Sequence, residues 1–239
     1  MALFSGEGFL FLLRWFHFLA GIAWIGMLYY FNFVQTPFFA TAEAPVRTGM
    51  LAGGLVARAL WWFRWGAMFT FITGWLIILH RLGQAGIGPF FGTSYGWAIF
   101  TGGMLGSVMW FNVWFVIWPA QQVVMASAQQ VAKGGQAIAE AAARGQRAGF
   151  ASRTNTMLSI PMLFFMGAAS HLAMFPGATG GSHLAMLILL AIVIAASEYN
   201  ALVGTTGAGK KMLGTLKGTF WAGFVLTAIL YFGMEIIFP

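Results

Sequence analysis

The sequence predicts an all-α integral membrane protein: a single domain over residues 1–239 that forms a bundle of six transmembrane helices. Hydrophobic residues make up 60% of the chain and charged residues only 7%, whereas a soluble domain has about a quarter charged residues. The apolar residues gather in runs of about 20, the length that crosses the hydrocarbon core as a helix. These runs are continuous rather than alternating, which favours helices over the strands of a membrane barrel.

Six apolar runs define the expected spans in chain order. They cover approximately residues 9–33, 60–81, 97–118, 156–175, 183–203 and 216–237. The first connection, residues 36–58, is semi-polar and contains Pro37 and Pro45, which indicates a segment at the membrane interface. The connection at 83–96 contains several glycines and Pro89, which are typical of turns.

The longest connection, around residues 120–150, is rich in Ala and Gln and consists mostly of good helix formers. We expect a helical segment there, either an extramembrane helical hairpin or a helix that lies on the membrane surface. Gly134 and Gly135 are expected to divide it into two shorter helices, because glycine is a poor residue for a helix interior.

The positive charges predict the orientation of the chain. Lysines and arginines gather in the connections after spans one, three and five: Arg47, Arg58, Lys133, Arg144, Arg147, Arg153, Lys210, Lys211 and Lys217. The opposite side has only Arg81 near a loop, together with Arg14 slightly inside span one. Since loops rich in Lys and Arg stay in the cytoplasm, we expect the 120–150 connection on the cytoplasmic side. Both termini are then outside, and the protein spans the bacterial inner (cytoplasmic) membrane several times.

Residues 204–211 read GTTGAGKK, which is close to the phosphate-binding loop GxxxxGK[ST]. That loop needs a strand before it, a helix after it, and a Ser or Thr that follows the Lys and holds magnesium. Here a predicted span precedes the segment and Lys211 takes the hydroxyl position. We therefore expect no nucleotide binding, and interpret the segment as a flexible turn whose lysines lie near anionic lipid. Nucleic acid is not expected either, because only 7% of the residues are charged.

All four histidines are expected in the outer half of the membrane. At 1.5 Å per residue, His17 lies about 12 Å from the outer end of span one, and His171 about 7 Å from that of span four. His80 and His183 lie at the outer ends of spans two and five. Ionisable side chains inside a span are costly and usually functional.

Two imidazoles at similar depth on different helices are the arrangement that a bis-histidine haem b requires. His17 and His171 are the better-matched pair for the haem iron. Arg14 lies one turn outward of His17 on the same helix face, where it would meet the haem propionates. Because the chain contains no cysteine, covalent haem attachment and thiolate-ligated iron–sulfur clusters are excluded.

Other interpretations of the histidines stay open. His17 and His171 also fit structural hydrogen bonds between helices, and zinc or copper would find no thiolate or membrane carboxylate nearby in the sequence. His80 and His183 form a shallower pair, which fits a second haem, a metal ion, or two interfacial side chains in contact with water.

Three segments resemble the N-terminal membrane domain of the bacterial membrane-bound urate hydroxylase family: RWFHFLAGIAWIG (14–26), NVWFVIWPAQQ (112–122) and SRTNTMLSIPMLFFMGAASH (152–171). The residues that carry the resemblance are His17, Trp24, Asn112, Pro119, Gln121, Asn155, Pro161 and His171. The resemblance implies oxidation of urate to 5-hydroxyisourate. Members of the family commonly carry a C-terminal cytochrome c domain. None follows the sixth span in this sequence, so we expect a separate periplasmic cytochrome c as a partner.

The leading hypothesis is a b-type-cytochrome-like membrane subunit that transfers electrons to or from a periplasmic carrier. Within the lipid bilayer, other membrane subunits are possible partners. A second hypothesis is an oxidase of urate or another small reductant. Its suspected polar residues are Asn112, Gln121, Asn155 and Arg153. A third is a structural subunit of a larger membrane complex without a cofactor, so the sequence leaves open whether the protein is an enzyme.

Overall fold

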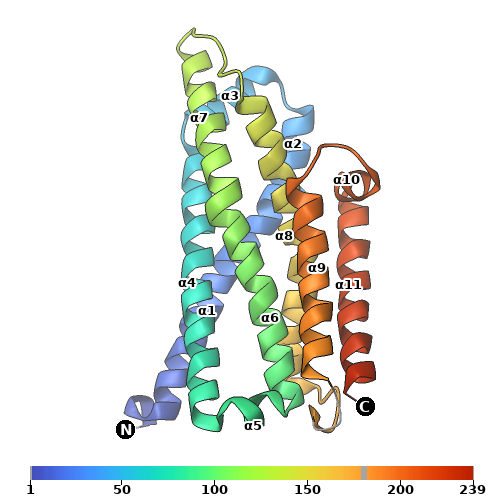
Figure 1. Cartoon of the computed structure of the whole chain (residues 1–239). Helices are drawn as coiled ribbons and strands as arrows, with labels where there is room; N and C mark the ends of the chain where they lie inside the picture. The colour runs from blue at the N-terminus through green and yellow to red at the C-terminus, as the bar shows by residue number, and fades with distance from the viewer. Residues whose placement is uncertain (1, 179–181, 239) are drawn as a thin grey trace.

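The computed structural model describes residues 2–178 and 182–238, and all regular secondary structure within them is helical. The long helices run side by side, and α1 begins at the end of the bundle where α11 ends (Figure 1). Five continuous helices in the described part of the chain are long and apolar enough to cross a membrane. The prediction of an all-α protein with membrane-spanning helices is confirmed for these five.

The first apolar run forms one continuous helix, Gly6–Thr41. It follows the short turn η1 (Ala2–Phe4) and consists of α1 (Gly6–Tyr29), the π-helical segment η2 (Tyr30–Gln35) and α2 (Thr36–Thr41). Next come α3 (Ala44–Ala52), α4 (Leu55–Ala85) and α5 (Ile87–Phe91). A second composite helix contains α6 (Ser94–Phe111), the π-helical segment η3 (Asn112–Ile117) and α7 (Trp118–Ala132). The remaining helices are α8 (Ala141–His171), α9 (His183–Leu202), α10 (Ala208–Leu213) and α11 (Leu216–Ile237).

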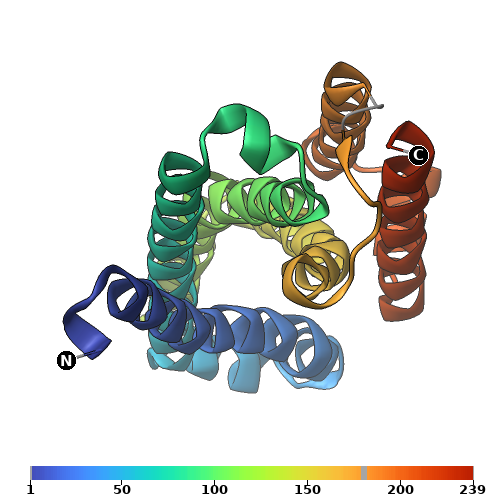
Figure 2. The same cartoon turned by 90° about the horizontal axis from the view of Figure 1, so that it is seen from below.

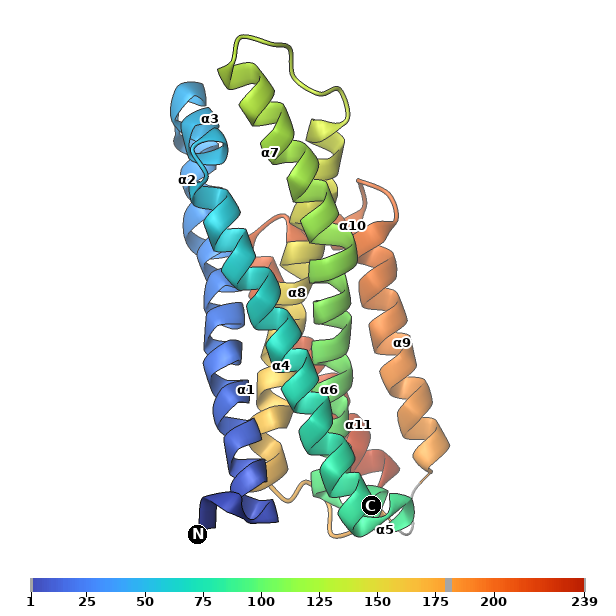
Figure 3. The same cartoon turned by 90° about the vertical axis from the view of Figure 1, so that its left-hand side faces the viewer.

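The predicted spans 183–203 and 216–237 coincide with α9 and α11. The third span does not end at residue 118 but continues through α7 to Ala132. The predicted helical connection is therefore a hairpin of α7 and the first half of α8, which projects beyond α9 and α11 and lies beside α3 (Figures 1 and 3). The chain turns between them at Gly134, whose φ of 83° favours glycine. The alternative of a helix lying on the membrane surface is wrong for this segment.

The fourth predicted span, 156–175, differs most from the structure. Helix α8 begins at Ala141 and ends at His171, and it is not among the five apolar helices. It lies between α1 and α6 on one side and α9 and α11 on the other (Figure 2). A helix enclosed by other helices does not need an apolar surface for lipid, so it can carry polar residues if they are hydrogen-bonded. The polar residues that α8 buries against its neighbours lower its mean hydropathy.

One face of α8 carries hydroxyl and amide groups that bond to α1 and its extension. Asn32 donates from Nδ2 to the hydroxyl of Ser152 at 2.8 Å. Tyr29 and Ser159 are joined through their hydroxyls at 2.9 Å. Because the Ser159 hydroxyl donates to the backbone oxygen of Thr156, the Tyr29 hydroxyl is the donor of the pair. These bonds fix the rotation of α8 relative to α1.

A second set of bonds joins α8 to the helices on its other side. The Nδ2 group of Asn112 donates to Oδ1 of Asn155 at 3.0 Å and to Oε1 of Glu198 at 2.8 Å. Asn155 in turn donates to the backbone oxygen of Met109 at 2.9 Å. Asn112 and Asn155 are fully buried. The network therefore connects the α6–η3 helix, α8 and α9.

Both π-helical segments end shortly before a proline, Pro37 in the first composite helix and Pro119 in the second. Proline lacks the N–H for an i→i−4 bond and crowds the carbonyl four residues earlier. The preceding turn widens instead, as π-helical turns do. Each widened segment contains a buried asparagine that bonds to α8, Asn32 in η2 and Asn112 in η3.

The GTTGAGKK segment forms a loop and the short helix α10, without the strand and long helix of a phosphate-binding loop. Lys211 is exposed, as expected for a charge near the membrane surface. Lys210 differs from the prediction, because it is buried and donates from Nζ to the backbone oxygen of Ala201 at 3.0 Å. Its ammonium also lies 4.2 Å from the ring centre of Phe150. Burial lowers the pKa of Lys210, since water no longer solvates the charge well.

The exposed apolar side chains lie mainly along the outside of the bundle. In the most apolar stretches of the first helix and of α11, only 22% and 17% of the residues are buried. Exposed examples include Trp15, Ile192, Trp221 and Ile236. Helices that expose this much apolar surface are consistent with contact with a lipid bilayer.

We expect the bond between Asn112 and Asn155 to couple their contributions to stability. In a double-mutant cycle of Asn112→Ala and Asn155→Ala, the coupling free energy should be about 1 kcal/mol, within the range measured between membrane helices. Unfolding in mixed detergent micelles provides the measurement. Ser197→Ala is the control, because within the described residues that hydroxyl bonds to the backbone oxygen of Val193 in its own helix and to no other helix. Strictly additive effects of the two asparagines would contradict this network.

Replacement of the two adjacent lysines should have different effects. Lys210→Met removes the donor to the buried Ala201 carbonyl and should destabilise the protein by about 1–3 kcal/mol, the cost of an unsatisfied buried group. Lys211→Met should leave the unfolding temperature in detergent unchanged, because that side chain is exposed. Equal unfolding temperatures for the two variants would show that Lys210 has no such structural role.

Candidate functional site

Helices α1, α4, α6 and α8 are arranged around a common centre (Figure 2). Residues from all four helices line a cavity of about 570 Å³. This volume is typical of sites for cofactors and drug-sized ligands. Its walls are largely apolar, and its polar side chains are few: Arg14, His17, Trp24, Thr70, Trp75, Tyr95, Ser107 and Ser170. The cavity lies in the half of the bundle near α5, where the sequence places its histidines.

Glycines keep the cavity open. Gly74 on α4 faces His17, and a Cβ there would lie 2.9 Å from Cε1 of the imidazole. Gly103 and Gly106 on α6 also line the cavity. A Cβ at Gly103 would lie 2.8 Å from Cδ1 of Ile78. Side chains at these positions would fill the space or displace its walls.

The hydrogen bonds of Thr73 determine which nitrogen of His17 is protonated. The Thr73 hydroxyl lies 2.7 Å from the backbone oxygen of Phe69, to which it donates. Its oxygen therefore accepts the bond from Nδ1 of His17, at 3.1 Å. With the proton on Nδ1, the other ring nitrogen, Nε2, keeps a free lone pair. Among the described residues, Nε2 has no side-chain hydrogen-bond partner.

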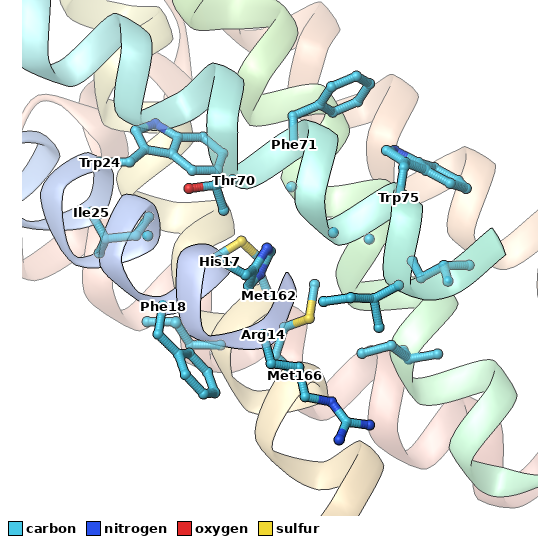
Figure 4. Close-up of a pocket in the computed structure, with 18 of the residues that line it drawn as sticks. Arg14, His17, Phe18, Trp24, Ile25, Thr70, Phe71, Trp75, Met162 and Met166 are labelled. Atoms are coloured by element: carbon cyan, nitrogen blue, oxygen red, sulfur yellow. The ribbon is translucent and has the colours of Figure 1, made fainter. Parts of the chain in front are cut away.

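This arrangement is the one that metal-ligating histidines usually have. One nitrogen donates to an oxygen acceptor, which fixes the tautomer and the ring orientation, and the other nitrogen carries the lone pair. His17 lines the cavity and is half-buried (Figure 4). The site can therefore bind a metal or accept a hydrogen bond from a ligand.

Arg14 lines the same cavity one turn from His17 (Figure 4). It is half-buried, and it forms no ion pair with any residue in the described ranges. The structure thus brings Arg14 and His17 to one site. A guanidinium beside an apolar cavity provides a binding point for a carboxylate.

The structure does not bring His171 to this cavity. His171 is the last residue of α8 and is exposed, whereas the preceding Ser170 lines the cavity. Of the predicted pair His17 and His171, only His17 lines the cavity. Their joint binding of a haem iron therefore stays a prediction.

The shallower pair, His80 and His183, lies on α4 and α9, and neither lines the cavity. His183 accepts a hydrogen bond at Nδ1 from the indole of Trp97 at 3.2 Å, and the two rings stack. His80 lies near Phe9, with ring centres 6.4 Å apart. Its Nε2 atom is buried and has no hydrogen-bond partner among the described residues.

The polar residues suspected for an oxidase lie away from the cavity. Asn112 and Asn155 are engaged in the bonds between helices. Gln121 is on α7, and Arg153 is half-buried on α8 with an Nη1 atom that has no partner in the described part of the chain. None of the four lines the cavity with His17.

Sequence reasoning missed the residues that shape the surroundings of His17. Thr73 and Gly74 are small residues in the middle of an apolar span, and Met162 and Met166 are two of the 14 methionines in the chain. A Thr-Gly pair inside a span is a usable signal for close contact with another helix, because small residues mark helix interfaces in membranes. The methionines carry no such signal, since they resemble ordinary apolar residues.

Comparison with known proteins identifies the family. A family model described as urate oxidase N-terminal matches residues 91–233, which include all of α6 and α8 and most of α11. Two of the three segments that suggested the resemblance fall inside this range. No curated protein and no solved structure gives a significant match. The matched range is more than half of the chain, and the protein belongs to the urate oxidase N-terminal family.

Proposed function

We propose that the chain is the membrane redox subunit of a system related to urate hydroxylase. In this proposal it holds one haem b in the cavity and exchanges electrons with a separate periplasmic cytochrome c. The observation that carries the proposal is the free Nε2 lone pair of His17 beside a cavity of about 570 Å³. Membership of the urate oxidase N-terminal family gives a redox context for it.

The residues present fit such a group. His17 would hold the iron through Nε2, with its ring kept in orientation by the hydroxyl of Thr73. Arg14 would pair with a propionate, and the apolar walls of α4 and α6 would exclude water from the ring. When bound, haem would supply one-electron redox chemistry, and the chain would tune it through the ligand, its hydrogen bond and burial.

We propose that α8 is the sixth span and that both termini are outside. Its second half, from Thr154 to His171, contains no charged residue other than His171. Helix α8 packs against four of the five apolar helices, those that contain α1, α6, α9 and α11. The lysines and arginines of the α7–α8 hairpin and of α10 lie at the opposite end from the start of α1 (Figure 1). This distribution supports a cytoplasmic location for that end. In this proposed orientation the cavity would lie in the half of a bacterial inner membrane that faces the periplasm.

A chain without cysteine allows this topology to be tested with single cysteines. Gly83→Cys and Lys133→Cys both lie at exposed positions, at opposite ends of the bundle. In intact cells, a thiol reagent that cannot cross the inner membrane should label the cysteine at 83 and leave the one at 133 unlabelled until the membrane is opened. The reverse pattern would contradict the proposed orientation.

Oxidation of urate or another small anionic reductant in the same cavity is the second candidate. The description of the matching family supports urate, and Arg14 provides a binding point for an anion. Reduction of the purified chain by added urate, abolished by Arg14→Gln, would favour this candidate. Electron transfer that occurs only with other donors would favour the electron-transfer subunit.

We expect a dithionite-reduced minus oxidised spectrum of the detergent-purified protein to show the α band of a b haem. His17→Ala should remove this band, and Thr73→Val should lower the haem content several-fold because the imidazole loses its acceptor. His80→Ala is the matched control and should keep the band, since His80 does not line the cavity. A flat spectrum from folded protein would contradict the proposal and favour a structural subunit without a cofactor.

A further inference from the structure

An arginine of α4, Arg64, lies among three indole rings. Its guanidinium carbon is 4.0 Å from the ring centre of Trp118, 4.9 Å from that of Trp114 and 5.5 Å from that of Trp65. The rings of Trp65 and Trp114 pack edge to face, with centres 5.4 Å apart. Aromatic faces attract a cation at such distances, so the indoles hold the guanidinium in place. These four residues are called the Arg64 cluster below.

The guanidinium of Arg64 lacks an acceptor. It forms no ion pair and donates no hydrogen bond to any residue within 2–178 and 182–238. Its Nε atom is buried without a partner, and so is Nε1 of Trp114. A charge in apolar surroundings is costly unless it is paired and hydrogen-bonded. The indoles attract the charge, but they provide no oxygen for its N–H groups, so an anion from outside the chain would complete the cluster.

The Arg64 cluster lies at the surface of the bundle, between α4 and the second composite helix. All four of its residues are half-buried. Trp61, whose ring contacts Trp65, is exposed, and so is Phe115, which follows Trp114. Because the outside of the bundle is apolar and fits contact with lipid, a lipid molecule can reach the guanidinium from the side.

A direct bond between helices gives the depth of the cluster. Asn112 donates to Glu198 of α9 at 2.8 Å. From these two residues the composite helix and α9 continue toward the same end of the bundle (Figure 1). Helix α9 ends at Leu202, about 6 Å further on, and Trp118 follows Asn112 by about 9 Å, at 1.5 Å per residue. The cluster is therefore close to the level at which the apolar helix α9 ends, where lipid headgroups and a belt of tryptophans are expected.

We propose that the Arg64 cluster binds the headgroup phosphate of an anionic phospholipid. A guanidinium presents its N–H groups as a planar fork that can donate two parallel bonds to a phosphate. Nearer the middle of the membrane, the exposed rings of Phe111 and Phe115 provide an apolar surface for the acyl chains. In the proposed orientation the site is in the cytoplasmic leaflet, whose anionic lipids attract arginine and lysine. The binding itself involves neither the cavity nor haem.

Native mass spectrometry of the detergent-purified protein with added phosphatidylglycerol tests the site. Arg64→Gln should weaken binding of this lipid about tenfold, because hydrogen bonds to a charged group are lost. Arg64→Lys should weaken it about threefold, since lysine keeps the charge without the fork. Arg58→Gln is the matched control: it removes the same charge from an exposed position on the same helix and should leave the affinity unchanged. The wild type should bind phosphatidylethanolamine less tightly, because the lipid ammonium offsets the phosphate charge.

Equal affinities of the wild type and Arg64→Gln, or equal losses in Arg64→Gln and Arg58→Gln, would overturn the proposal. If Arg64→Gln does not fold, Arg64→Lys decides, and wild-type affinity in that variant would show that the fork is not used. Displacement of phosphatidylglycerol by millimolar inorganic phosphate would show a site for free phosphate and contradict the lipid assignment. Absence of haem would leave this proposal standing, and reversed labelling of the cysteines at 83 and 133 would change only the leaflet.

Discussion

The bundle depends on the burial of a polar helix. Helix α8 carries Ser152, Asn155 and Ser159 on its buried side, and each of them is bonded to another helix or to its extension. An unsatisfied polar group in the interior would cost about 1–3 kcal/mol. The neighbouring helices must therefore present donors and acceptors at fixed depths. The two π-helical segments serve this purpose, because each places a buried asparagine against α8.

The same helix changes character along its length, and this change positions the candidate site. The polar residues bonded to other helices, Ser152, Asn155 and Ser159, lie nearer the α7–α8 hairpin, and Met162 and Met166 follow them toward the end near α5. There α6 and α8 meet through glycines and thioethers, and the cavity lies beside His17. Rigid contacts at one end and open space at the other are a suitable arrangement for holding a cofactor in a defined orientation.

The sequence predicted depth along the helices better than rotation about their axes. The ends of α9 and α11, the break at Gly134, and the presence of Arg14 and His17 on one face follow from apolar run length and helical rise. Whether His171 points toward a cavity depends on the rotation of α8. That rotation is set by bonds from Asn32 and Asn112 that no local pattern in the sequence reveals. The low hydropathy of α8 also reflects tertiary packing, because neighbouring helices surround this helix where lipid would otherwise contact it.

Two other features were beyond sequence reasoning for physical reasons. The burial of Lys210 depends on the carbonyl of Ala201 and the ring of Phe150, which approach it from α9 and α8. The cavity depends on glycines from separate helices that face the same space. Such features arise from tertiary packing, whereas hydropathy and spacing describe one helix at a time.

The central claim is that the space between α1, α4, α6 and α8 is a cofactor site organised by His17. An experimental structure of the protein purified from its native membrane, determined by cryo-electron microscopy, tests this most directly. We predict planar density that fills the cavity and continues to Nε2 of His17, with Nδ1 still bonded to Thr73. Density for a lipid chain only, or a cavity closed by packing of α1 against α8, would contradict the account.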